Sequence, residues 1–77
     1  MTLVELRYLI AVAEQGSFRR AAEQVHVSQP ALSLAIARLE DELGVKLFER
    51  GKSRVATTAI GVAVVAQARR VLAEAAA

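Results

Sequence analysis

Residues 29–34 carry side chains suited to contacts with the bases of DNA. Gln29 can bond adenine through two hydrogen bonds, and the hydroxyl of Ser33 can bond several bases. Pro30, Ala31 and Leu34 can contact the methyl group of thymine. A helix face exposed to solvent usually carries several Lys and Glu side chains, whereas a helix in the major groove needs small side chains and a few donors or acceptors. We therefore expect base contacts from all five of these residues.

Basic residues on both sides of this segment predict contacts with a polyanion. Residues 50–77 hold five basic residues and one acidic residue, whereas residues 1–49 hold five basic and seven acidic residues. The basic side chains suit phosphate groups, although a surface of ordinary solvated arginines is an alternative. The residues predicted to contact the DNA backbone are Arg19, Arg20, Ser28, Arg38, Lys52, Ser53 and Arg54. The acidic run Glu40 to Glu42 should lie outside the groove, because phosphates would repel it.

Apolar periodicity and capping residues predict three helices that would position these side chains. The first helix should span residues 3–15, between the capping box of Thr2 with Glu5 and a terminal Gly16. The second should begin after Ser17 and end near Gln24 or Val25, and the third should span residues 29–43. His26 falls in the turn between them, where the backbone can need a positive φ, so we interpret it as a turn residue and not as a metal ligand.

After Gly44 the alternation of Val45, Lys46 and Leu47 predicts a two-stranded hairpin with a polar tip from Arg50 to Arg54. We expect Arg50 itself to be structural, paired with Glu40 or Glu49. Two helices joined by a short turn and followed by a basic hairpin form a winged helix-turn-helix. The fold class is therefore mainly α.

Thr58 can cap a last helix whose apolar stripe is broader than a thin domain needs. The expected role of this stripe is dimerisation, through Ile60, Val64, Val65, Ala68, Val71 and Leu72. An alternative is that this helix lies over the first helix within a monomer. The sequence thus divides into a DNA-binding part, residues 1–58, and a dimerisation helix, residues 59–77.

The composition restricts the classes of protein that remain. A chain of 77 residues allows one small domain, and the lack of cysteine excludes disulfides and, with a single histidine, a zinc site. Self-association is the remaining source of additional burial. The chain has neither the basic start of a secretory signal nor an apolar run long enough for a membrane helix, so we expect a cytoplasmic protein without membrane contact, cofactor or small-molecule ligand.

Two other classes of function are alternatives to DNA binding. A protein-interaction module would use the apolar face of the last helix and would not bind DNA. An enzyme would need a paired nucleophile and base or a phosphate-binding glycine loop, and the sequence offers neither.

The chain resembles the amino-terminal domain of LysR-type transcriptional regulators over nearly its whole length. The resemblance rests on LRY at 6–8, GSFRRAAE at 16–23, VSQPALS at 27–33, LEDELG at 39–44 and LFER at 47–50. It implies a bacterial regulator that dimerises through a long linker helix, forms tetramers at full length and binds interrupted inverted repeats rich in A·T. It also implies base contacts at Gln29, Pro30, Ala31 and Ser33, and wing contacts at 52–54.

Within the family, several stretches are most similar to peroxide-sensing members, among them FRRAA at 18–22 and HVSQP at 26–30. The resemblance further implies that an effector domain is absent and that the chain ends within its linker helix. Three features depart from the family pattern. Leu34 stands where a long polar residue is common, TTAIG at 57–61 replaces the usual Leu-Thr-Pro-Ala-Gly, and Val62 stands where a charge is common.

Overall fold

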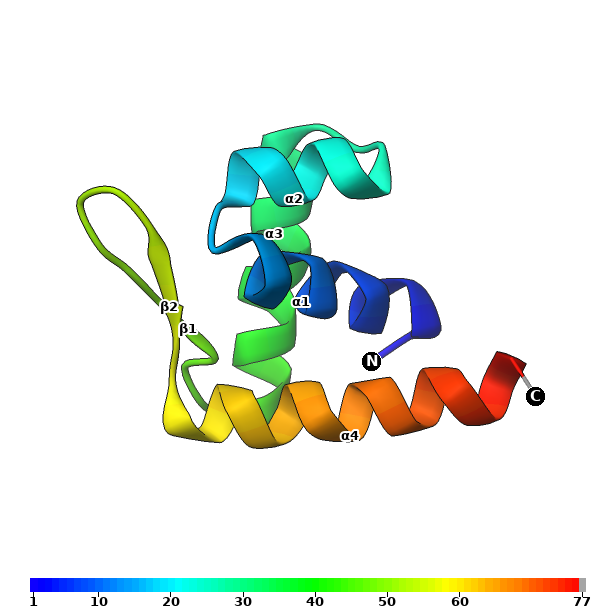
Figure 1. Ribbon diagram of the computed structural model, residues 1–77. Helices are drawn as coiled ribbons and strands as arrows, with labels where there is room; N and C mark the ends of the chain where they lie inside the picture. The colour runs from blue at the N-terminus through cyan, green and yellow to red at the C-terminus, as the bar shows by residue number, and fades with distance from the viewer. Residues whose placement is uncertain (77) are drawn as a thin grey trace.

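The protein folds around its first helix, as a computed structural model that describes residues 1–76 shows (Figure 1). The elements in chain order are α1 (Leu3–Gln15), α2 (Phe18–Val25), α3 (Gln29–Leu43), β1 (Phe48–Arg50), β2 (Val55–Thr57) and α4 (Ala59–Ala76). In Figure 1, α1 lies between α2 and α4, α3 crosses them, and the hairpin extends away from the end where both chain termini lie. The four expected helices are confirmed.

Short-range hydrogen bonds set the helix ends. The Thr2 hydroxyl accepts from the Glu5 amide, and the Glu5 carboxylate accepts from the Thr2 amide, as in a capping box. Ser17 and Ser28 cap α2 and α3 by accepting from backbone amides three residues later. His26 ends α2 with φ at 60°, which confirms the predicted positive φ of the turn.

The core forms where α1 meets the other three helices. Five of its large side chains are almost completely buried, namely Leu9, Val12, Leu32, Leu39 and Leu47. On α2 the buried core positions after Phe18 are the small residues Ala21 and Ala22, which let this short helix approach α1 and α3 closely. The packing therefore fixes α2 and α3 relative to each other, and with them the surface that carries the candidate site.

Hydrogen bonds from backbone amides attach the hairpin to the helices at two points. The Glu40 carboxylate of α3 accepts from the amides of Leu47, at 2.7 Å, and Phe48, at 3.3 Å. At the other strand, the Val55 amide donates to the carbonyl of Gly16 at 2.9 Å. The expected strand start at residue 45 is wrong, because these bonds and the bond from Val45 to the Glu40 carbonyl direct the segment toward α3. Pairing begins at Phe48 and already includes Arg50, opposite Val55.

Helix α4 lies alongside α1 within the monomer (Figure 1). Val65 and Ala68 are buried in the core, and Arg69 pairs with Glu14 of α1 at 3.2 Å. The alternative in which the last helix lies over the first helix within a monomer is therefore correct for the face of α4 that carries Val65 and Ala68. Val65 and Ala68, both expected in the dimer contact, are 8% and 2% exposed, so the chain's own core leaves little of either side chain for a partner.

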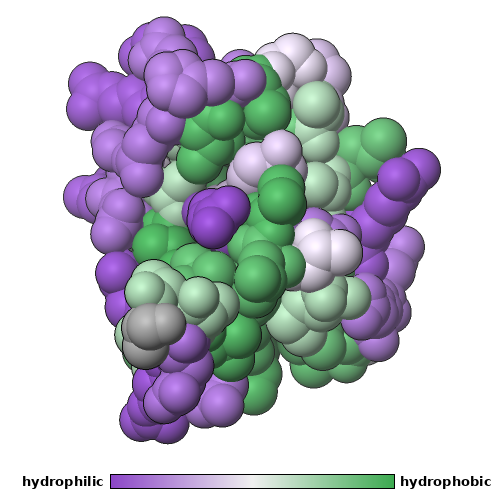
Figure 2. Space-filling model, turned by 90° about the vertical axis from the view of Figure 1, so that its right-hand side faces the viewer, coloured by the Kyte–Doolittle hydropathy of each residue, from purple (hydrophilic) through white to green (hydrophobic). Residues whose placement is uncertain are grey.

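An apolar groove of about 360 Å³ nevertheless remains open beside α4. We define the apolar groove by its lining residues, which are Met1, Leu6, Leu43, Ala63, Val64, Gln67, Ala68 and Val71. Figure 2 shows apolar side chains gathered across the middle of the face near the termini, with polar side chains around them. Among the described residues, no helix is long and apolar enough to cross a membrane.

Candidate nucleic-acid interface

The amino-terminal half of α3 presents its predicted base-contact residues to solvent. Gln29, Pro30 and Ala31 are exposed, and Leu34 is 52% exposed despite its large apolar side chain. Pro30 can lie in the first turn of α3 because the amides of that turn need no partner within the helix. Ser28, predicted to contact the DNA backbone, accepts from the Ala31 amide at 3.1 Å and so also has a structural role.

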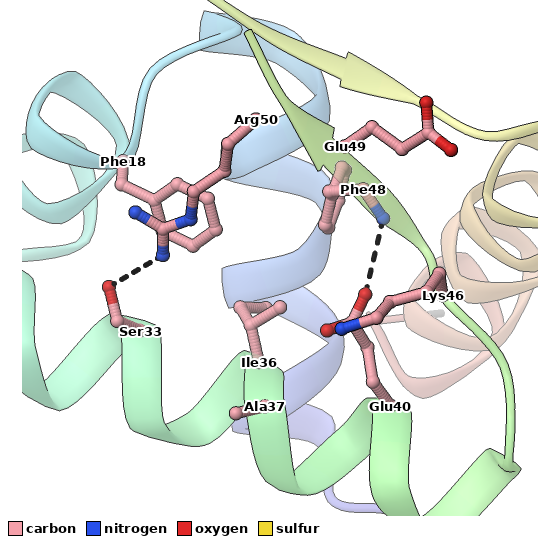
Figure 3. Close-up of a pocket in the computed structure, with 9 residues that line it drawn as sticks. All are labelled: Phe18, Ser33, Ile36, Ala37, Glu40, Lys46, Phe48, Glu49 and Arg50. Carbon is pink, nitrogen blue, oxygen red and sulfur yellow. Dashed lines mark hydrogen bonds between the residues drawn. The ribbon is translucent and has the colours of Figure 1, made fainter.

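Ser33 differs from its neighbours because it is half-buried and bonded to the hairpin. A guanidinium nitrogen of Arg50 donates to the Ser33 hydroxyl oxygen at 3.3 Å. The same guanidinium lies 3.9 Å above the centre of the Phe18 ring (Figure 3). Phe18 in turn packs edge-on against Phe48 of β1. The hairpin, α2 and α3 therefore meet at this cluster.

The expected pairing of Arg50 with Glu40 or Glu49 is wrong. The Glu40 carboxylate is already occupied by the two amides that precede and begin β1. Glu49 points away from Arg50 in Figure 3, because adjacent strand residues face opposite sides of the sheet. A hollow of about 460 Å³ lies between α3 and β1 at this point, and Arg50 and Ser33 both line it.

Three arginines from two distant segments line one polar hollow. Arg19 and Arg20 come from the first turn of α2, and Arg54 comes from the hairpin. The hollow measures about 500 Å³, and its other lining residues are Gln15, Gly16, Ser17 and Ser53. Arg54 reaches the hollow by lying over Gly16. A terminal guanidinium nitrogen of Arg54 is 3.2 Å from the position that a Cβ atom on residue 16 would occupy. We call this feature the arginine hollow.

The arginine hollow has the charge and the donors that a phosphate group needs. The partial positive charge of the α2 amino terminus adds to that of the guanidinium groups. Arg19 also pairs with Glu23 at 3.3 Å, but both side chains are about two-thirds exposed, so water screens this pair strongly. A neighbouring hollow of about 210 Å³ brings Gln29 beside Arg19 and Arg54. Candidate base-contact and phosphate-contact residues are thus adjacent.

Sequence patterns did not reveal this convergence, because α3 and the first strand of the hairpin separate Arg54 from Arg19 and Arg20 in the chain. The bond between Val55 and Gly16, together with the contacts of Arg50 and Phe48 with Phe18, brings the hairpin to the start of α2. Two other predicted backbone contacts, Arg38 and Lys52, are exposed but line neither of these two hollows.

The opposite end of α3 is acidic. Asp41 and Glu42 are exposed there, and the Met1 amine donates to the Glu42 carboxylate at about 3.0 Å. This hydrogen bond raises the pKa of the Met1 amine above its ordinary value. Within residues 1–76, no group of three or more acidic or histidine side chains could hold a metal ion. The charge along α3 therefore favours an approach of DNA at its amino-terminal half.

Two helices joined by a short turn, with a basic two-stranded wing beside the second helix, define a winged helix-turn-helix domain. The family model of the bacterial regulatory helix-turn-helix proteins of the LysR family matches residues 3–62. The chain belongs to this family, whose members use such domains to bind DNA and regulate transcription.

Relatives agree with this assignment. The DNA-binding transcriptional dual regulator OxyR of Escherichia coli K12 is 54% identical over 74 residues, which are 96% of this chain and 24% of the relative. Full-length OxyR from Pseudomonas aeruginosa has a similar structure, with a TM-score of 0.92 and 56% identity over 97% of this chain and 25% of that one. A complex of the CbnR DNA-binding domain with DNA matches at a TM-score of 0.95 and 43% identity, over 99% of this chain and 87% of that one. The chain thus spans about a quarter of the length of the curated relatives, which are regulators and not enzymes.

Proposed function

We propose that this chain recognises a specific sequence in double-stranded DNA, with the amino-terminal half of α3 in the major groove. The observation that carries the proposal is the position of the exposed Gln29 beside the arginine hollow. A phosphate held in that hollow would set the position of the duplex, and the bases would then lie against the start of α3. Phosphate contacts set the register of such a complex, and base contacts supply its specificity.

The phosphate contacts are assigned to Arg19, Arg20 and Arg54, which line the same hollow. Lys52 and Ser53 at the tip of the wing extend this surface along the DNA backbone or into a narrow minor groove rich in A·T. Arg38 and the Ser28 hydroxyl are further backbone contacts. Each neutralised phosphate releases counterions, so binding should weaken steeply as the salt concentration rises.

The base contacts are assigned to the exposed residues of the first turns of α3. Gln29 has a free amide group suited to adenine, and Pro30, Ala31 and Leu34 offer apolar surface to thymine methyl groups. Ser33 contributes its hydroxyl. The acidic end of α3, at Asp41 and Glu42, leaves the groove because phosphates repel it.

We further propose that a second copy of the chain binds beside α4. Ile60 is 47% exposed and Val71 is 37% exposed, while Val64 and Leu72 are half-buried. Val62, 60% exposed, enlarges this apolar surface. Covering it would supply burial that a chain of 77 residues lacks by itself. Two-fold symmetry would then match an interrupted inverted repeat in the DNA, with the two α3 helices one DNA turn or a multiple apart.

In the complete regulator, α4 would be the linker helix that precedes an effector domain; residue 77, which the sequence also assigned to this helix, lies outside the described residues. The greater length of the relatives supports this division. We propose a cytoplasmic bacterial regulator that forms dimers through α4 and tetramers at full length. Relatives named hydrogen peroxide-inducible genes activator, such as that of Pectobacterium carotovorum, favour peroxide as its signal.

The test is selection of bound duplexes from random DNA, followed by affinity measurements on the selected site. The expected site is an inverted repeat rich in A·T. Gln29→Ala should reduce the preference for one base pair in each half-site by about 10-fold or more. Gln24→Ala is the matched control, because the Gln24 side chain bonds Gln15 and Glu14 on α1. Weak binding without sequence preference, unchanged by Gln29→Ala, would refute the proposal.

A further inference from the structure

We infer that Arg50 shapes base specificity without touching a base, by occupying one lone pair of the Ser33 hydroxyl and so favouring that hydroxyl as a hydrogen-bond donor toward the DNA. The inference rests on the proposed recognition of DNA through α3. It concerns a single contact across the hollow between β1 and α3, the bond from Arg50 to Ser33 (Figure 3).

The Arg50 guanidinium is held in place on two sides. Its planar group lies 3.9 Å above the ring of Phe18, an arrangement that a cation and an aromatic face stabilise. Phe18 is only 6% exposed and rests edge-on against Phe48 at a centroid distance of 6.4 Å, so the ring is a firm support. The position of Arg50 in the paired strand β1, opposite Val55, fixes its backbone as well. The guanidinium is thus positioned before any DNA binds.

The chemistry of the contact determines the role of the hydroxyl. A guanidinium can only donate hydrogen bonds, so Ser33 must accept this one with its oxygen. The hydroxyl hydrogen is then directed away from Arg50. Among the hydrogen bonds of residues 1–76 the Ser33 hydroxyl donates to no partner, which leaves its hydrogen available to a ligand. Ser33 lies on the same helix as the exposed Gln29 and Leu34, so that ligand is the DNA.

A freely rotating serine hydroxyl can donate to one base edge or accept from another, so it discriminates poorly between bases. A hydroxyl that is directed to donate discriminates better. With one lone pair taken by Arg50, the hydroxyl offers one hydrogen and one remaining lone pair to a base edge. This favours the acceptors guanine N7 and O6, adenine N7 and thymine O4 over the amino groups of adenine and cytosine. Loss of Arg50 would free the second lone pair and let the hydroxyl rotate, which would weaken its preference for acceptors over amino groups. The effect should therefore be confined to the base pair that Ser33 faces.

The test compares base preference and salt dependence in five proteins: the unaltered chain, Arg50→Met, Ser33→Ala, the double variant of these two and Arg50→Lys. Methionine retains a favourable contact with the Phe18 ring but has no donor, so the packing is preserved. Affinities are measured for a set of duplexes that carry every base at each position of the selected half-site. Circular dichroism and thermal unfolding verify that each variant is folded, and Arg50→Lys tests rescue by another obligate donor.

We expect Arg50→Met to reduce the preference at one position by about 5- to 10-fold, the value of about one hydrogen bond. Ser33→Ala should change the same position, and the double variant should lose no more than Ser33→Ala alone. Arg50→Lys should restore part of the preference. The slope of log affinity against log salt should stay within about 0.3 of that of the unaltered chain, because no phosphate contact is lost.

Two results would overturn the inference while leaving the proposed function intact. One is an equal loss of affinity on all duplexes with a salt slope smaller by about one unit, which would make Arg50 a phosphate contact. The other is a changed preference at a position that Ser33→Ala leaves unaffected. Absence of any base preference in the unaltered chain would instead refute the proposed function, and the inference with it.

Discussion

Replacing Gly61 with alanine tests how closely α4 must approach the start of the hairpin. A Cβ at this position would overlap the carbonyl oxygen of Leu47 and would lie 2.8 Å from the Thr57 side chain. The Leu47 carbonyl cannot easily move, because it accepts from the Thr58 amide at 3.0 Å. Leu47 is also fully buried. The added methyl group must therefore displace α4.

Two opposing effects set the size of the change. In an unconstrained helix, glycine to alanine stabilises by about 1 kcal/mol. Forcing a methyl group into a packed site costs about 1–3 kcal/mol, and here the obstacle is hydrogen-bonded backbone, so the upper part of that range applies. We expect Gly61→Ala to lower the free energy of unfolding by about 1–2 kcal/mol net, which for a domain of this size lowers Tm by roughly 4–15 °C.

Thermal and urea unfolding at one fixed protein concentration measure this effect, since dimerisation would otherwise contribute to the apparent stability. Ala66→Gly is the matched control, because Ala66 is an exposed position of the same helix and reports helix propensity alone. It should cost about 1 kcal/mol. A higher Tm for Gly61→Ala would show that α4 does not need the close contact with Leu47.

Three further predictions concern charged groups. Arg54→Ala should weaken binding to all DNA sequences to a similar extent and reduce the slope of log affinity against log salt by up to about one unit. The control Arg69→Ala removes an arginine that does not line the arginine hollow, so this slope should stay unchanged in filter-binding or fluorescence titrations. Glu40→Gln should cost about 1–2 kcal/mol in urea unfolding, because its carboxylate accepts from two amides at the start of the hairpin and charged acceptors form the stronger bonds. The raised pKa of the Met1 amine should add stability that is fully present below its ordinary value of 8.0 and is lost as pH rises through the higher value of the folded state. Glu42→Gln should flatten this pH dependence in thermal unfolding, and an unchanged profile would refute the assignment.

Local sequence determined the helices and the face that α3 presents. The ends of α1, α2 and α3 follow from residues that bond their own neighbours, such as Thr2 with Glu5 and Ser28 with Ala31. These bonds span three residues, so residue type and spacing are sufficient to predict them. The exposed base-contact candidates followed in the same way from helical periodicity, because the apolar stripe at Leu32, Ile36 and Leu39 had to turn inward.

Tertiary structure decided which partner each long or apolar side chain takes. Arg50 had carboxylates close by in sequence, yet it stacks on Phe18, because Glu40 is taken by backbone amides and Glu49 faces the other side of the strand. Val65 belongs to the same broad apolar stripe as the exposed Val71, and only the packing of α4 on α1 buries one and leaves the other. The meeting of Arg54 with the start of α2 likewise depends on contacts across the fold, namely the bond from Val55 to Gly16 and the packing of the hairpin on Phe18. Such choices are made by contacts between segments distant in the chain, and the spacing of residues within a segment carries no information about them.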